Sequence, residues 1–247
     1  MLPIYFPEVM KVGIRKCVEM AVIYTLVVSG FLGSAWLGSR AVTVMVLKEA
    51  AEQATVIVID PGHGGEDGGA VSCTGTPEKE INLKISLRLN DLLHLLGYRT
   101  KMIRTTDVSV CQSGDTVSQR KASDLRTRVQ TVNDLKSPLL VSIHQNLFPD
   151  ARYSGAQVFY DPAGEGQALA EALQASFRNT VNPGSRREIK KAEGIYLMEN
   201  VSCPAVLIEC GFLSNPKEES NLSSSEYQKN LCILIATEVV KFLDCQT

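Results

Sequence analysis

The sequence predicts an α/β fold: a single three-layer domain with a twisted, mostly parallel sheet of about six strands flanked by helices, plus an N-terminal hydrophobic helix. Short apolar runs alternate with amphipathic stretches, which is typical of a sheet covered on both faces. Three of these runs, at 55–60, 139–144 and 205–209, end at or just before a residue that can bind metal or transfer a proton. Because parallel strands end at one crevice, we expect those residues to meet there.

The first half of the domain begins with the β-branched run Thr55–Asp60, which predicts a buried strand. A glycine-rich stretch follows, and a helix is then expected over 78–96. Gly97 is its natural stop, because glycine readily adopts the left-handed conformation found after helix C-termini. A short strand is expected at 99–103.

The second half continues the alternation. A helix is expected at 119–135, where Leu125, Val129 and Val132 form one apolar stripe. Strands are expected at 139–143, 156–160, 194–198 and 205–209, and helices at 165–178 and 226–243. Neither an internal repeat nor a low-complexity tract interrupts this order, so residues 53–247 are predicted to form one catalytic domain.

An uncharged segment precedes this domain. No charged residue lies between Glu19 and Arg40, and this length suffices for a helix to cross a bilayer. Basic residues lie just before it, so the positive-inside rule leaves residues 1–19 in the cytoplasm and exports the rest. We therefore expect residues 20–39 to be a signal anchor, or a signal peptide cut after a small-x-small pair, with a linker at 40–52. A buried core helix is the weaker alternative, because such helices usually keep a polar face.

The composition excludes several functions. With 45% apolar and 21% charged residues the chain is ordinary globular material, and its net charge of -2 gives no electrostatic case for nucleic acid binding. Seven cysteines contain no C-x-x-C pair, which argues against a cysteine zinc cluster or a thioredoxin-like motif. An odd number of cysteines also argues against a complete disulfide framework.

Two of the three histidines, His63 and His144, follow or end apolar strands and are candidate metal ligands. Hydrolytic zinc sites typically use three nitrogen or oxygen ligands and leave a fourth position for water. Spacing alone leaves the carboxylate ligand open among four candidates, Glu66, Asp67, Glu78 and Glu80. The last two lie about 200° apart on a helix, so only one of them can face the site.

Other polar residues have plainer interpretations. Glu209 at the end of its strand is either an acid-base residue or a salt-bridge partner. Cys210 alternates to the opposite face of that strand, which argues against a catalytic thiol. The acids of the glycine-rich stretch, Asp60 included, are typical of turns or of supporting contacts. Arg104 and Asn146 are candidate contacts to glycan or peptide.

Four strings, DPGHGGEDGGA, TPEKEINL, SIHQN and LIECGFLSNP, occur in this order between residues 56 and 243. In them the chain resembles the zinc-dependent N-acetylmuramoyl-L-alanine amidases of the amidase-3 family. The resemblance implies a Zn²⁺ ion held by His63, Glu78 and His144, with Glu209 as the catalytic carboxylate. The implied reaction is hydrolysis of the amide bond between the lactyl group of N-acetylmuramic acid and L-alanine in peptidoglycan.

Two further strings, RKASDLRTRV at 120–129 and GIYLMENV at 194–201, are similar to those of the germination-specific, CwlD-type amidases of endospore formers. This likeness implies work on spore cortex on the route to muramic-δ-lactam, in the forespore intermembrane space, with a lipoprotein partner in some species. The alternatives are a general autolysin or division amidase, another zinc peptidoglycan hydrolase (a peptidase or deacetylase), and a catalytically silent wall-binding module. A silent module predicts a missing ligand or base, whereas all four positions are filled.

Overall fold

The computed structural model describes residues 55–245 continuously and, before them, the helical residues 20, 22, 24–26, 28–31, 33–34 and 36. The chain divides into two units, residues 1–53 and 54–247. The expected cytoplasmic stretch 1–19 and the linker 40–52 lie outside the described residues, as does part of the hydrophobic segment 20–39. Among the residues that are described, none belongs to a helix with the length and apolar character needed to cross a bilayer.

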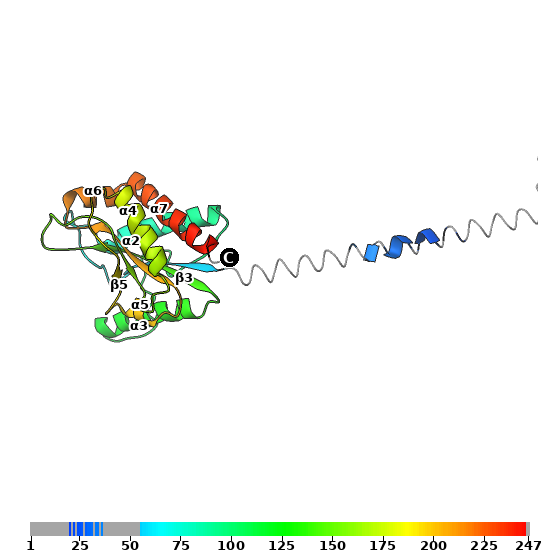
Figure 1. Ribbon diagram of the computed structural model, residues 1–247. Coiled ribbons are helices and arrows are strands. Elements are labelled where there is room, and N and C mark those ends of the chain that lie inside the picture. The colour runs from blue at the N-terminus through cyan, green and yellow to red at the C-terminus, as the bar shows by residue number, and fades with distance from the viewer. Residues whose placement is uncertain are drawn as a thin grey trace, which may run out of the picture. The chain divides into compact units, whose positions relative to one another are not determined.

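One sheet of six strands forms the centre of the second unit (Figure 1). Its strands are β1 (Val56–Pro61), β2 (Arg99–Met102), β3 (Pro138–Asn146), β4 (Gln157–Tyr160), β5 (Lys190–Lys191) and β6 (Ala205–Phe212). They lie in the order β2-β1-β3-β6-β4-β5, and every neighbouring pair is parallel except β4 with β6. The mostly parallel sheet expected from the sequence is confirmed.

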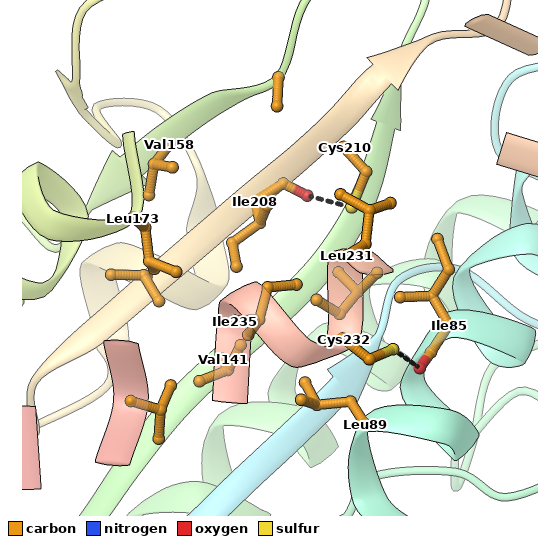
Figure 2. Packing of buried hydrophobic residues seen from close by; sticks show 14 of the residues in the cluster. Ile85, Leu89, Val141, Val158, Leu173, Ile208, Cys210, Leu231, Cys232 and Ile235 are labelled. Carbon is orange, nitrogen blue, oxygen red and sulfur yellow. Dashed lines mark hydrogen bonds between the residues drawn. The ribbon is translucent and has the colours of Figure 1, made fainter. Parts of the chain in front are cut away.

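Helices cover both faces of this sheet, as Figure 1 shows. They are α2 (Glu78–Leu95), α3 (Val117–Asn133), α4 (Gln167–Asn179), α5 (Tyr196–Asn200), α6 (Pro216–Ser223) and α7 (Ser225–Asp244). The larger apolar core lies between the sheet and α2, α4 and α7; Figure 2 shows Val141 and Ile208 of the sheet packing with Ile85 and Ile235 of these helices. A smaller core joins the opposite face to α3 and α5. The three-layer arrangement is therefore confirmed.

The strand expected at 194–198 is wrong, because this segment contains the short helix α5. A brief apolar run has no period long enough to separate strand from helix, and local hydrogen bonds decide the outcome here. The amide of Gly194 donates to Glu199 Oε1 at 2.6 Å, and Asn200 Nδ2 donates to the carbonyl of Tyr196 at 2.8 Å. Helix α6 and the two-residue strand β5 were not expected from the sequence.

The order of the strands brings the predicted chemistry to one edge. Strands β1, β3 and β6 are neighbours and parallel, so their carboxyl ends lie together. His144 is the direct cross-strand partner of Glu209. The loop after β1 is tied to the same edge, since the amide of Gly62 donates to the carbonyl of Ile143 at 3.0 Å. Helix α2 begins at that edge with Glu78.

Candidate metal centre

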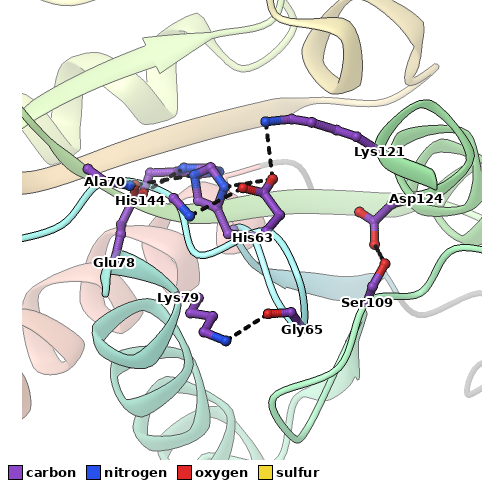
Figure 3. A network of polar contacts seen from close by, with 12 residues as sticks. His63, Gly65, Ala70, Glu78, Lys79, Ser109, Lys121, Asp124 and His144 are labelled. Atoms are coloured by element: carbon purple, nitrogen blue, oxygen red, sulfur yellow. Dashed lines mark hydrogen bonds and ion pairs between the residues drawn. The ribbon is translucent and has the colours of Figure 1, made fainter. Parts of the chain in front are cut away.

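His63, Glu78 and His144 lie together at this edge of the sheet (Figure 3). One ligand atom from each residue lies within 4.8 Å of the other two. His63 Nε2 is 3.2 Å from Glu78 Oε2, and His144 Nδ1 is 3.1 Å from Glu78 Oε1. The three side chains come from a loop, a helix start and a strand end that are far apart in the sequence.

The other three carboxylate candidates are engaged elsewhere. Glu66 pairs with Arg120 at 2.8 Å, and Glu80 lies 3.7 Å from Lys84 on the outer side of α2. Asp67 contacts His63 at Nδ1, the ring nitrogen that faces away from Glu78. Glu78 is thus the carboxylate that the fold places between the two imidazoles.

Glu78 is held as an ionised acceptor. Its oxygens accept hydrogen bonds from the amides of Ala70 and Gln145, each at 3.0 Å, and from Asn82 Nδ2 at 3.1 Å. Burial alone would raise the pKa of Glu78, but the hydrogen bonds and charges of His144 and His63 outweigh it and keep this pKa far below its usual range. The carboxylate is therefore charged and oriented toward both rings.

His63 is oriented from behind by Asp67. Asp67 Oδ2 lies 3.0 Å from His63 Nδ1, which keeps the proton on that nitrogen and leaves Nε2 as the ligand atom. Burial lowers the pKa of His63, but Glu78 and Asp67 more than compensate, so this pKa is raised. Lys121 Nζ in turn lies 3.2 Å from Asp67 Oδ2.

Glycine is required where the loop after β1 approaches the cluster. A Cβ at Gly62 would lie 2.3 Å from the His144 ring, and one at Gly69 would lie 2.6 Å from Glu78 Oε2. His63 itself has a φ of 61°, a conformation that residues other than glycine rarely adopt. The glycine-rich stretch therefore allows the backbone to pass close to the ligand atoms.

The donor set fits a tetrahedral divalent metal with one open position. Bonds of 2.0–2.1 Å to nitrogen and oxygen place neighbouring ligand atoms about 3.3 Å apart in a tetrahedral site. His63 Nε2 lies 3.2 Å from Glu78 Oε2, and His144 Nδ1 lies 3.1 Å from the other oxygen, Oε1, so each imidazole is close to this spacing from one carboxylate oxygen. Two imidazoles and one carboxylate are also the ligand types that hydrolytic zinc sites use.

Glu209 lies beside this cluster. As direct cross-strand neighbours, His144 and Glu209 project from the same face of the sheet. Glu209 Oε2 is buried and has no hydrogen-bond partner among the described residues. Burial raises the pKa of Glu209 to about 7, with His144 opposing this shift and the charge of Glu78 adding to it. A carboxyl group with such a pKa is suited to proton transfer near neutral pH.

This raised pKa predicts a pH-dependent stability in the metal-free protein. The pKa of Glu209 is about 7 in the folded protein and 4.5 in the unfolded chain, so the folded state holds this proton more tightly. The stability gained from protonation is fully present below pH 4.5 and is lost as the pH rises through 7. The variant Glu209→Gln should therefore be more stable than wild type at pH 8 by about 3 kcal/mol. The difference should vanish near pH 4.5. Urea unfolding in chelator at both pH values measures it, and a pH-independent difference would contradict the raised pKa.

Two buried arginines hold the loop that carries His63. Arg104 donates to the carbonyls of Pro61 and Gly62, both at 3.0 Å, and to that of Lys79 at 2.9 Å. Only 3% of Arg104 is exposed, and its guanidinium donates to these backbone carbonyls. The expectation that Arg104 contacts substrate is therefore wrong. Asn146, the other candidate contact, ends β3 opposite Phe212 and remains a prediction.

Arg128 is a supporting residue that sequence reasoning missed. Its guanidinium pairs with Asp60 and Asp124, each at 2.5 Å, and donates to the carbonyl of His63 at 2.8 Å. Burial would lower the pKa of Arg128, but the charge of Asp60 reverses this and raises it, so the side chain stays charged. Ser142 Oγ donates to the second oxygen of Asp60 at 2.7 Å. A basic residue on α3 four positions after an acid was the available signal, but many solvent-exposed helices share it.

Replacing Arg128 by Met should destabilise the fold by about 3–5 kcal/mol, because it leaves the carboxylate of Asp60 buried without a cation. Urea unfolding of the purified chain measures the change. The matched control is Arg126→Met on the same helix, where the side chain is exposed and the change should stay within about 0.5 kcal/mol. Equal stabilities of the two variants would show that the buried ion pair does not support the loop.

A cavity of about 300 Å³ opens beside the two imidazoles. His63, His144 and Lys121 border its polar side. Its apolar side comes from α3, from α5 and its preceding residue, and from β6, with the residues Leu125, Ile195, Leu197 and Leu207. The cavity thus offers an organic ligand room next to the candidate metal position.

Comparison with known proteins identifies the family. Residues 57–241 match the N-acetylmuramoyl-L-alanine amidase family. The germination-specific N-acetylmuramoyl-L-alanine amidase of Bacillus subtilis is 39% identical over 189 residues, covering 76% of this chain and 79% of that protein.

Solved structures give the same result. The CwlD amidase of Clostridioides difficile, solved in complex with the GerS lipoprotein, is similar with a TM-score of 0.74 and 34% identity, covering 77% of this chain and 98% of that chain. An N-acetylmuramoyl-L-alanine amidase from Clostridium difficile 630 is similar with a TM-score of 0.69 and 29% identity, covering 79% and 100%. The motifs, the fold and these matches agree: the chain belongs to the N-acetylmuramoyl-L-alanine amidase family.

Proposed function

We propose that this chain uses Zn²⁺, held by His63, Glu78 and His144, to hydrolyse the amide bond between the lactyl group of N-acetylmuramic acid and L-alanine. The observation that carries the proposal is the convergence of these three side chains beside Glu209, whose buried Oε2 has no hydrogen-bond partner among the described residues. Zinc in such a donor set polarises a carbonyl group and lowers the pKa of water to about 7.

Glu209 supplies the acid-base chemistry in this proposal. Its carboxylate takes a proton from the attacking water as the water oxygen forms a bond to the lactyl carbonyl carbon. The same proton then passes to the nitrogen of L-alanine as the carbon–nitrogen bond breaks, which releases a neutral amine and a lactyl carboxyl group. Asp67 keeps the ring of His63 in its orientation throughout.

The setting that we propose is the spore cortex. The similar Bacillus subtilis enzyme is named for germination, and this supports a role on the route to muramic-δ-lactam. In that setting residues 20–39 export the domain as a membrane anchor or a cleaved signal, which places it in the forespore intermembrane space. A lipoprotein partner is proposed because the similar Clostridioides difficile enzyme was solved with one.

Product analysis on purified cortex peptidoglycan tests the proposed reaction. The full chain loaded with zinc should release peptides with a new L-alanine amino terminus and leave muramic acid with a free lactyl carboxyl group, both detectable by mass spectrometry. Chelation should abolish the products and added zinc should restore them. Release of acetate would indicate a deacetylase instead, and amino termini other than L-alanine would indicate a peptidase.

A further inference from the structure

A second hollow lies beyond Glu209 along the sheet, on the side of β4 and β5. It has a volume of about 810 Å³ and is wider than the cavity beside the imidazoles. We call it the basic groove; the lining residues that matter here are Arg152, Tyr153, Gln157, Arg186, Arg187 and Lys190. None of them belongs to the metal cluster.

The basic groove is connected to the catalytic edge through Gln157. In the antiparallel pair of β4 and β6, Gln157 is the direct cross-strand partner of Glu209, so both side chains project from the same face of the sheet. Gln157 Oε1 accepts a hydrogen bond from Arg187 Nη1 at 2.9 Å. A substrate that reaches Glu209 is therefore one strand away from the guanidinium of Arg187.

Arg187 is held in place by its surroundings. Its Nε donates to the carbonyl of Ser154 at 2.8 Å, and its guanidinium carbon lies 4.4 Å from the centre of the Phe212 ring. Tyr153 packs on the same ring, with 6.2 Å between centroids. A half-buried guanidinium fixed by a carbonyl, an amide and an aromatic ring has little rotational freedom to lose on binding an anion.

The groove also carries an excess of positive charge. Arg152 is neutralised by Asp150 at 2.7 Å, and Glu188 is paired with Arg178 at 2.9 Å. Arg186 and Lys190 are exposed, and neither has an ion-pair partner among the described residues. The remaining charge attracts an anion, and Arg187 provides a planar donor that suits a carboxylate.

We propose that the basic groove binds the free carboxylates of the peptide stem, on the leaving-group side of the scissile bond, with Arg187 as the anchor. The inference rests on the proposed function, because it assumes that this peptide leaves from the metal cluster. The muramic acid side of the substrate then faces the cavity beside His63 and His144, whose apolar wall suits the face of a sugar ring. The substrate would then lie in one direction along the sheet, with its muramic acid near α5 and its peptide stem near β5.

The test compares purified peptidoglycan with the same material after its free carboxylates are converted to carboxamides. The enzymes are the zinc-loaded full chain, the double variant Arg186→Gln with Lys190→Gln, and the single variants Arg187→Gln and Arg187→Lys. Initial rates of release of L-alanine amino termini, measured over a range of substrate concentrations, separate KM from kcat. Zinc content and thermal unfolding of each variant show that the site and the fold remain intact.

Wild type should have a kcat/KM about tenfold higher on the carboxylate material than on the carboxamide material, which is the effect expected of one charge-assisted hydrogen bond. The difference should lie mainly in KM. Arg187→Gln should lose most of that preference, and Arg187→Lys should keep part of it. The double variant should keep most of it, because the guanidinium of Arg187 remains in place. Lys229→Gln, a charge removal on the exposed face of α7, should retain the wild-type preference. Equal rates on both materials, or an unchanged preference in Arg187→Gln, would overturn the inference. Absence of L-alanine termini from either material with wild type would instead contradict the proposed function.

Discussion

Replacing Glu209 by Gln is expected to lower kcat by about 10²- to 10⁴-fold, which is the usual contribution of a general acid-base group. The amide keeps the size of the side chain but can neither accept the proton of water nor return it to the leaving amine. Zinc content and KM should change little, because Glu209 is not one of the three ligand residues. Rates of L-alanine amino-terminus release, with elemental analysis of the same samples, measure both properties.

The pH dependence of the remaining activity gives an independent check on this role. Wild-type activity should rise as Glu209 loses its proton, because the ionised form is the base, and a bound divalent cation will shift that limb below the metal-free pKa of about 7. This limb should disappear in Glu209→Gln. Near-normal turnover by the variant with zinc bound would remove Glu209 from the mechanism.

Replacing Glu78 by Gln should lower zinc affinity by more than about 100-fold. Loss of a residue that only hydrogen-bonds to a metal ligand lowers affinity by up to about 100-fold, and loss of a ligand itself should cost more. The amide is neutral, so it loses the charge that attracts the cation, and it places an NH₂ group against donors that Glu78 now accepts from. Activity at equimolar zinc should fall in proportion to occupancy. Titration of the metal-free protein with zinc, followed by calorimetry, measures the affinity directly.

Glu80→Gln is the matched control for this experiment. It makes the same chemical change two residues later on α2, where Glu80 lies near Lys84 and away from the imidazoles. Its zinc affinity and turnover should equal those of wild type. If Glu78→Gln bound zinc as tightly as Glu80→Gln, Glu78 would be excluded as a ligand.

Much of the architecture was predictable because its signals are local. The β-branched runs of β1, β3 and β6 and the apolar stripe of α3 depend on side-chain periodicity, which a sequence displays directly. The segment at 194–198 was misread because four or five apolar residues satisfy either period, and the hydrogen bond from Gly194 to Glu199 that closes α5 is not a periodic feature.

Support for the site was the least predictable part. Arg104 and Arg128 are 43 and 65 residues from the backbone carbonyls of Pro61 and His63 that they bind. The local sequence around such a buried arginine does not differ from that around a solvent-exposed arginine. Only burial in the folded protein distinguishes the two. The basic groove was equally hidden, because it depends on the antiparallel pairing of Gln157 with Glu209.

The amino-acid sequence by itself determined the chemistry of this protein: two histidines at strand ends, an acidic residue closing a third strand, and four ordered motifs that identify an amidase family. Only the geometry of the folded protein showed which carboxylate lies between the imidazoles. Glu66, Asp67, Glu78 and Glu80 are equivalent acids in the chain, but the start of α2 points one of them at both rings and pairs or exposes the others. The reason is physical: strand order and helix placement, set by burial of apolar faces, position groups that sequence distance does not relate.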